Sequence, residues 1–388
     1  MLRRTAISLS IVVLALLFSL PAVADNPPTF GEPVRGLTPA QQAAFQAGLD
    51  DFTSVESIVP DGLGPVFNEA SCATCHSVPA VGGGSTRIET RFGKLTNGIF
   101  DPMTNRGGSL LQDHAIPGFT PEHVPTEFGA TIQTGRRTTP LFGLGLVDAV
   151  PDGYFRLLEA IESLSPGTAG KVHMVADPVH GGTSVGKFGW KAQVPNLHTF
   201  AGDAYLNEMG ITNPLFPNES CPQGDCSLLA ANPVPTLNDD GSGVQKFTDF
   251  MTMLAPPPRG PITADVLAGE VVFNIVGCAA CHTSVLVTGN SDVAELRFKA
   301  FQPFSDFLLH DMGSLGDGIV QGNATGSQIR TSPLWGLRVE TRLLHDGRAT
   351  TIEQAILGHA GQGAAARNRF TALNAVDKAR LMAFLNSL

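Results

Sequence analysis

The chain has 388 residues, of which 43% are hydrophobic and 15% are charged, and its formal net charge is −10. This acidic balance argues against a nucleic acid as the partner, because nucleic-acid binding needs a basic surface. The 43 glycines and 28 prolines predict a loop-rich protein, whereas the hydrophobic fraction is too high for a disordered chain, and the length suits two domains.

The first 24 residues have the pattern of a secretory signal peptide. Arg3 and Arg4 precede an apolar run at residues 6–20, and Ala22-Val23-Ala24 forms an A-x-A cleavage pattern. The apolar run is too short to span a bilayer comfortably, and no later stretch is long and apolar enough to do so. We therefore expect cleavage near Ala24 and a mature protein, residues 25–388, that is periplasmic or otherwise exported.

Two copies of a Cys-x-x-Cys-His motif are the strongest functional signal in the chain. In c-type haem proteins the two cysteines attach the porphyrin through thioether bonds, and the histidine binds the iron. Thiols three positions apart lie on one side of a helical turn, and the next residue can then direct its imidazole at the iron. The motifs predict two covalently attached haems, held by Cys72, Cys75 and His76 and by Cys278, Cys281 and His282.

Other interpretations of these cysteines are weaker. A zinc site would have to pool ligands from both motifs, and a thioredoxin-like Cys-x-x-Cys needs a βαβ context that the sequence lacks. A disulfide inside either motif would be strained. The two remaining cysteines, Cys221 and Cys226, flank Pro222 and Gly224, which favour a tight turn. In an oxidising compartment this pair predicts a short-loop disulfide.

A second repeated segment follows each haem motif. GRRTTPLFGLGL at residues 135–146 and QIRTSPLWGLRV at residues 328–339 share Arg-Thr, Pro-Leu, an aromatic residue and Gly-Leu. Their arginines, Arg137 and Arg330, could bind haem propionates, and a surface salt bridge is the alternative for each. The repetition indicates a duplicated cytochrome-c-like unit.

The predicted fold is mainly α with many loops and consists of two cytochrome-c-like haem domains. The first, residues 25–257, is enlarged by insertions near residues 82–134 and 150–185. Three successive prolines mark the boundary, and the second domain covers residues 258–388. Helices are expected at both haem motifs, at Val244–Leu254 and at Asn374–Leu388, the last with Val376, Leu381, Phe384 and Leu385 on its apolar side.

The residues now assembled resemble the bacterial di-haem oxidoreductase family, whose members are labelled peroxidases or "thiol oxidoreductases". That family is related to di-haem cytochrome c peroxidases and to the di-haem enzyme that matures methylamine dehydrogenase. The resemblance rests on GLGPVFNEASCATCHSVPA, KFGWKAQVPNLHTFAGDAYLNEMGITNPLFP, FLLHDMG and LLHDGRATTIEQAILGHAG, among others. It covers most of the mature chain, but it specifies a family more closely than a reaction.

The resemblance implies that the C-terminal haem is six-coordinate and transfers electrons. In the relatives the distal ligand of this haem lies a fixed number of residues after the segment that corresponds to His345–Gly347, and it is Met or Tyr. The matching residue in this chain is His359. Together with His282 this would give bis-histidine ligation and a lower potential than His/Met ligation. His310 and Met312 are the alternative ligands, and a solvated helix-end histidine is the alternative interpretation of His359. His345 itself is expected to contact a propionate or to support another ligand through a hydrogen bond, rather than to bind the iron.

The resemblance also implies that the N-terminal haem is the reactive one. Its distal acid–base residue corresponds to Glu208, which could accept a proton from one peroxide oxygen and return it to the other; the alternative is a surface Glu on a glycine-rich loop. The sequence has no histidine between His76 and His114, so an open, five-coordinate iron is expected. Four residues remain possible sixth ligands of this iron: Met103, His114, His123 and His198.

The leading hypothesis is an enzyme that reduces hydrogen peroxide at the N-terminal haem. Electrons from a cytochrome or cupredoxin would pass through the C-terminal haem and Trp190, which the resemblance places between the haems and which could otherwise be a core residue. Two alternatives stay open, namely haem-dependent oxidation of an organic or protein substrate, and a non-catalytic electron-transfer cytochrome with two six-coordinate haems. The relatives hold an inter-domain calcium, but no acidic loop in this sequence specifies one.

Overall fold

The structure is a computed structural model that describes residues 27–234 and 236–388. The signal peptide predicted at residues 1–24 lies outside the described residues. The described part is rich in helices and loops, and its α-helices are α1 (Pro39–Thr53), α2 (Cys72–Cys75), α3 (Leu144–Asp148), α4 (Asp152–Glu162), α5 (Leu197–Met209), α6 (Ser242–Met253), α7 (Ala264–Val276), α8 (Ile352–Leu357), α9 (Ala364–Thr371) and α10 (Ala375–Leu385).

Within residues 27–234 and 236–388 the strands are short and form five small antiparallel sheets, ordered β1-β4, β3-β2-β5, β6-β7, β8-β9 and β10-β11. They are β1 (Val66–Phe67), β2 (Ile88–Thr96), β3 (Ile99–Asp101), β4 (His114–Ala115), β5 (Ile132–Arg137), β6 (Met174–Ala176), β7 (Thr183–Val185), β8 (Leu286–Val287), β9 (Ala300–Phe301), β10 (Leu309–Asp311) and β11 (Gln328–Arg330). Loops and single 3-10 turns connect these elements.

The larger hydrophobic core is built around α1, α5 and α6. Thr38 caps α1 through a reciprocal capping box with Gln41, which satisfies backbone donors that the first turn leaves free. Gly48 of α1 allows α6 to approach closely, because a Cβ there would lie 2.3 Å from the Lys246 carbonyl oxygen. Phe45, Phe52 and Phe250 fill the contact. The same cluster also takes Leu286, Phe301 and Trp335 from the C-terminal part of the chain.

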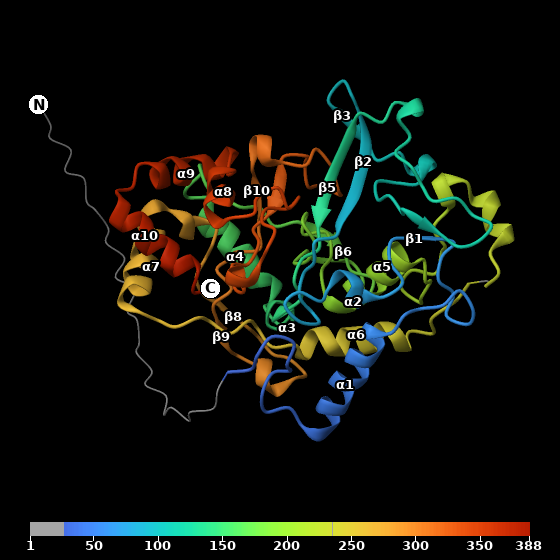
Figure 1. The fold of residues 1–388 in the computed structure, drawn as a ribbon, viewed down its shortest axis with the longest axis horizontal. Coiled ribbons are helices and arrows are strands. Elements are labelled where there is room, and N and C mark those ends of the chain that lie inside the picture. The colour runs from blue at the N-terminus through green and yellow to red at the C-terminus, as the bar shows by residue number, and fades with distance from the viewer. Residues whose placement is uncertain (1–26, 235) are drawn as a thin grey trace, which may run out of the picture.

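A second core forms where α7 packs on α10. A Cβ at Gly269 of α7 would lie 2.0 Å from the Arg380 carbonyl oxygen, so only glycine permits this contact. The rings of Phe273 of α7 and Phe384 of α10 contact each other at an interplanar angle of 57°, with their centroids 5.2 Å apart. Figure 1 shows α7, α8, α9 and α10 gathered at one end of the molecule, with α1, α5 and α6 toward the other.

The helices predicted from the sequence are present. The helix α6 ends at Met253, and α7 begins at Ala264, so the successive prolines lie in the non-helical stretch between them. Leu381, Phe384 and Leu385 of α10 are buried, but the prediction that Val376 belongs to the same apolar side is wrong, since Val376 is 59% exposed. The first haem motif forms the α-helical turn α2, and Cys278–Ala280 of the second forms a 3-10 turn.

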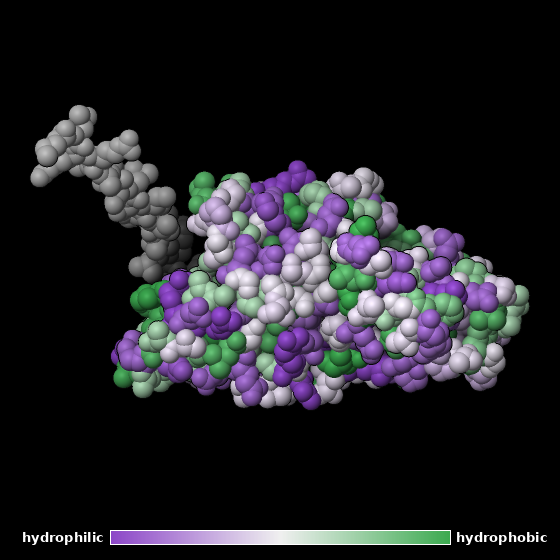
Figure 2. All heavy atoms as spheres, turned by 90° about the horizontal axis from the view of Figure 1, so that it is seen from above, coloured by the Kyte–Doolittle hydropathy of each residue, from purple (hydrophilic) through white to green (hydrophobic). Residues whose placement is uncertain are grey.

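The segment at residues 82–134, predicted as an insertion, contains regular structure. Strand β2 pairs with β5 along six residue pairs, among them Ile88 with Arg137 and Glu89 with Arg136. This ribbon rises from the middle of the molecule in Figure 1. Within the described residues, no helix is long and apolar enough to cross a membrane. The face seen in Figure 2 intersperses hydrophilic with hydrophobic residues.

Candidate functional site

Two neighbouring cavities contain the two Cys-x-x-Cys-His motifs. The N-terminal cavity is lined by Cys72, Cys75 and His76, and the C-terminal cavity by Cys278, Cys281 and His282. The first cavity has a volume of about 180 Å³ and the second a volume of about 200 Å³. Because each motif lines its own cavity, the structure speaks against a zinc site that pools the ligands of both.

The first motif presents a neutral imidazole and two protonated thiols. The backbone N–H of His76 donates to the Cys72 carbonyl across 3.0 Å, and its Nδ1 lies 3.1 Å from the Gly83 carbonyl oxygen, which fixes the ring. Burial lowers the pKa of His76 to about 4 and raises the pKa of both Cys72 and Cys75 to about 12. Neutral imidazole is the form that binds iron, whereas a zinc site or a reactive cysteine needs a thiolate.

Glu208 lies in the N-terminal cavity together with His76. It occupies the last turn of α5, whose N-terminus is capped by the Asn196 side chain 2.8 Å from the Thr199 N–H. Asn68 donates its Nδ2–H to the Glu208 carboxylate across 2.7 Å and its backbone N–H to the Glu208 carbonyl, also across 2.7 Å. Burial, and then the charge of Glu89, raise the pKa of Glu208 to about 8. The alternative of a surface Glu on a loop is therefore wrong.

Several charged residues of this cavity, among them Glu89, Arg91 and Asp203, were not predicted from the sequence. Glu89 and Arg91 come from strand β2 and form an ion pair of 2.9 Å, and Asp203 comes from α5. Burial raises the pKa of Asp203 to about 6. The spacing of Glu89 and Arg91 by two residues places both on one face of a strand, which is a signal that the sequence contains.

The four residues that could have closed the first haem do not line the N-terminal cavity. His114 forms an ion pair with Asp113, and His123 forms one with Glu127. The Nδ1 atom of His198 lies 3.1 Å from the Thr248 hydroxyl. Within the described residues, His76 is the only histidine of this cavity.

The C-terminal cavity brings His282 and His359 together. The Nδ1 atom of His282 lies 2.9 Å from the Phe304 carbonyl oxygen, and that of His359 lies 2.7 Å from the Ala355 carbonyl oxygen. Both rings are therefore anchored through Nδ1, which leaves Nε2 as the coordinating atom. Burial lowers the pKa of both histidines, that of His282 to about 4. His359 thus belongs to the cavity wall and is not a solvated helix-end residue.

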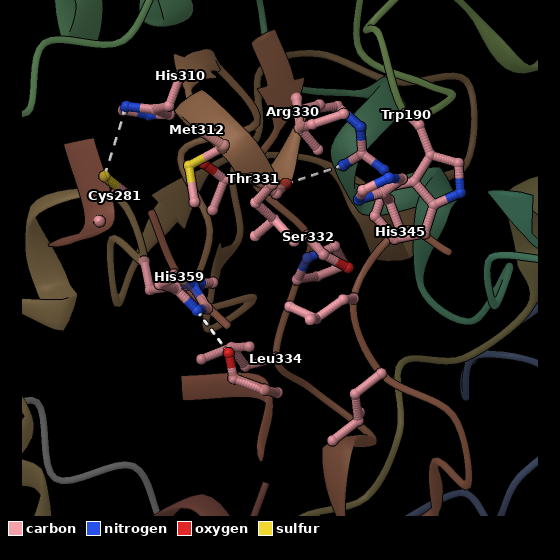
Figure 3. Close-up of a pocket in the computed structure, with 18 of the residues that line it drawn as sticks. Trp190, Cys281, His310, Met312, Arg330, Thr331, Ser332, Leu334, His345 and His359 are labelled. Carbon is pink, nitrogen blue, oxygen red and sulfur yellow. Dashed lines mark hydrogen bonds between the residues drawn. The ribbon is translucent and has the colours of Figure 1, made fainter. Parts of the chain in front are cut away.

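The two alternative ligands differ in their surroundings. Figure 3 shows Met312 and His359 directed into the same space. A Cβ placed on Gly363 would lie 3.0 Å from His359 Cδ2 and 3.3 Å from Met312 Cε, so the two side chains meet there. His310 has both ring nitrogens engaged, with Nε2 2.9 Å from Asp306 and Nδ1 3.4 Å from the Cys281 sulfur. This leaves His310 poorly suited to bind iron.

Trp190 lines both cavities, so it lies between the two motifs. Its Nε1–H donates to the Arg137 carbonyl across 2.9 Å, and its ring contacts that of His345 edge-on at 6.2 Å. Figure 3 shows Trp190, His345 and Arg330 grouped on one side of the C-terminal cavity. His345 Nε2 is buried and has no hydrogen-bond partner. The position of Trp190 agrees with the predicted relay, although its role stays a prediction.

The two repeated arginines are buried, so the surface-salt-bridge interpretation is wrong for both. Arg137 is paired with Glu340 and lines both cavities. Arg330 donates to the Gly189 carbonyl across 2.7 Å and to the Thr331 carbonyl across 3.1 Å, but it forms no ion pair with any described residue. Burial lowers its pKa to about 10.

Arg330 hydrogen-bonds only to backbone carbonyls, and Asp306, the carboxylate whose charge acts on it, is already bound to His310. An anionic group in the C-terminal cavity would lower the cost of burying this cation. Arg330, the unpartnered His345 Nε2 and the anchored imidazoles together fit a haem with its propionates. The remaining cysteines, Cys221 and Cys226, form a disulfide, as predicted.

Comparisons with known proteins agree with this interpretation. A family model described as "Di-haem oxidoreductase, putative peroxidase" matches residues 128–388. No curated protein sequence matches the chain.

Among solved structures, a MauG-like protein associated with microbial copper homeostasis is 15% identical, over 96% of this chain and 95% of that one, with a TM-score of 0.41. The diheme peroxidase BthA from Burkholderia thailandensis is 14% identical over 89% and 86%, with a TM-score of 0.40. Hydrazine synthase from Kuenenia stuttgartiensis is 12% identical over 100% and 99%, with a TM-score of 0.37. These TM-scores are too low to support an argument about function.

Proposed function

Because the chain belongs to the di-haem oxidoreductase family, we propose that it is an exported, periplasmic enzyme that reduces hydrogen peroxide at an N-terminal c-type haem. Electrons reach that haem through a C-terminal c-type haem from a cytochrome or cupredoxin. The family match supports haem-dependent oxidoreductase chemistry. The assignment to peroxide rests on the N-terminal cavity, and export rests on the signal-peptide pattern.

The two cavities supply residues to hold both groups. Cys72, Cys75 and His76 would hold one haem, and Cys278, Cys281 and His282 would hold the other. His359 would bind the second haem together with His282, and Arg330 and Arg137 would bind its carboxylate groups. When bound, the haems supply the redox chemistry. The protein contributes the iron ligands and a group for proton transfer. It also offers His76 in the N-terminal cavity and a pair, His282 and His359, in the C-terminal cavity.

The observation that carries the proposal is the shared cavity of His76 and Glu208. A carboxyl group with a pKa of about 8 can change protonation state near neutral pH, which suits general acid–base catalysis. Glu208 can pass a proton between the two oxygens of a peroxide, so that one oxygen leaves as water. A non-catalytic electron carrier has no use for such a group, and the cavity offers no second histidine within the described residues.

The second cavity suits electron transfer. His282 and His359 occupy it together, and each is anchored by a backbone carbonyl. Trp190 borders both cavities and offers an aromatic path between them. Oxidation of an organic or protein substrate would use the same residues, but the ribbon of β2 and β5 places charged groups on the N-terminal cavity, which favours a small polar oxidant.

Replacement of Glu208 by Gln tests the proposal. Glu208→Gln keeps the shape of the side chain and removes its base, so we expect turnover of hydrogen peroxide to fall by about 10²- to 10⁴-fold with both haems retained. Glu353→Gln is the matched control, since Glu353 is an exposed residue of α8 paired with Lys378. Full activity of Glu208→Gln, or no peroxide turnover by the wild-type protein with any reduced donor, would contradict the proposal.

A further inference from the structure

Two carboxyl groups meet in the N-terminal cavity. Glu89 comes from strand β2 and Glu208 from the last turn of α5, and both side chains line this cavity, where the two carboxyl groups lie close enough to interact. Ionised carboxylates have only acceptor atoms, so a hydrogen bond between two carboxyl groups needs a proton on one of them. Glu208 also accepts from Asn68 Nδ2, and Glu89 accepts from Arg91 Nε across 2.9 Å.

The charges around the pair also call for one proton. The connected buried groups comprise four carboxyl groups and three cations: Glu89, Asp203, Glu208 and Asp317, with Arg91, Arg136 and Lys191. Asp317 is shared by Arg136 at 2.7 Å and Lys191 at 2.8 Å. Buried charges that are not balanced are costly, and a single proton makes the cluster neutral. Cys75, Glu69 and Arg87 line the same wall, and the last two form a salt bridge of 3.3 Å.

We propose that Glu89 and Glu208 form a carboxyl dyad that holds one proton, in which Glu208 faces the peroxide and Glu89 is its positioning residue. This rests on the proposed function. The Arg91 contact keeps Glu89 ionised, so the proton resides on Glu208. Burial alone would raise the pKa of Glu89, but Arg91 and Arg136 lower it, whereas burial and Glu89 raise that of Glu208 to about 8. Two carboxyl groups with separated pKa values behave in this way when they share a site.

A dyad with one proton and one vacant position can donate and accept in the same reaction. Glu208 gives its proton to the departing peroxide oxygen, which leaves as water when the O–O bond breaks. The dyad regains a proton from the other oxygen, so its own proton count does not change. Overall, hydrogen peroxide takes two electrons from the redox donor and two protons from solvent and yields two water molecules.

The dyad can be tested without an activity assay, by infrared spectroscopy of the ferric holoprotein. At pH 7 we expect one carboxylic-acid band that Glu208→Gln removes. Glu89→Gln should weaken the same band and move its titration midpoint down by about one pH unit, because the like charge beside Glu208 is gone. Glu89→Asp keeps that charge and should retain the band.

A buried carboxyl group elsewhere provides the control. Burial raises the pKa of Glu219 to about 8, and Glu219 does not line the N-terminal cavity, so Glu219→Gln should remove a different band. The dyad is wrong if Glu89→Gln leaves the Glu208 band and its midpoint unchanged. If the infrared bands behave as expected but the protein does not reduce peroxide, the proposed function is wrong and the dyad is still supported.

Discussion

Asp317 is expected to be the carboxylate whose loss most weakens the contact between the two cavities. Its side chain is fully buried, accepts a hydrogen bond from Arg136 Nε across 2.9 Å, and forms ion pairs with Arg136 Nη2 at 2.7 Å and with Lys191 Nζ at 2.8 Å. Arg136 belongs to strand β5, and Lys191 follows Trp190 directly. Lys191 also donates to the carbonyl oxygens of Thr325 and Gln328, at 2.8 and 2.6 Å. The carboxylate therefore ties β5, the Trp190 loop and the C-terminal part together.

Asp317→Asn keeps the shape of the side chain but leaves two buried cations without their counter-ion. Removal of one partner from a buried ion pair costs about 3–5 kcal/mol. The loss should depend on pH, because burial already lowers the pKa of Lys191 to about 8 and the loss of Asp317 lowers it further. Between the lowered pKa of Lys191 in the variant and pH 8, the unfolded variant binds a proton that the folded variant does not, whereas in the wild type Lys191 is protonated in both states. The stability of the variant therefore rises with pH in that window, relative to the wild type. We expect a larger deficit at pH 6 than at pH 9.

Urea unfolding of the holoprotein, followed by circular dichroism, measures this deficit. Glu353→Gln removes an exposed ion pair with Lys378 and should change the free energy of unfolding by about 0–1 kcal/mol. The reasoning is refuted if Asp317→Asn is no more destabilising than Glu353→Gln, or if its deficit is the same at both pH values.

Three further predictions concern single features. Trp190→Phe should slow electron transfer between the haems, measured by stopped-flow reduction of the N-terminal haem, and equal rates would remove Trp190 from the path. His359→Ala should convert the C-terminal haem from low-spin to high-spin in its visible spectrum, unlike His310→Ala, and an unchanged spectrum would point to another ligand such as Met312. Joint replacement of Cys221 and Cys226 by Ser should cost about 2 kcal/mol in urea unfolding, from the entropy of a short closed loop, and no loss would contradict that account.

The sequence predicted what depends on local spacing. Two Cys-x-x-Cys-His motifs fix thiols and imidazole within one turn, and the structure places each set in a cavity. The family resemblance predicted that Glu208 belongs to the N-terminal haem site and that Trp190 lies between the haems. In the structure Glu208 lines the same cavity as His76, and Trp190 lines both cavities. The helix α10 was predicted from its periodicity, but Val376 turned outward because the helix packs on α7 with one face only.

The sequence could not predict what depends on pairing between distant segments. Glu89 and Arg91 reach the N-terminal cavity only because β2 pairs with β5. The burial of Arg330 could not be inferred either, since an Arg-Thr-x-Pro-Leu segment is compatible with the surface. The same holds for His310, whose engagement by Asp306 and Cys281 follows from the fold.

The most direct test of the account is a low-temperature electron paramagnetic resonance spectrum of the purified ferric protein. The account assigns an open haem to the cavity of His76 and Glu208 and a bis-histidine haem to the cavity of His282 and His359. It predicts one high-spin and one low-spin signal that correspond to equal amounts of the two haems. Two low-spin signals would show that both irons are closed at rest and would contradict an open peroxide site in the resting protein.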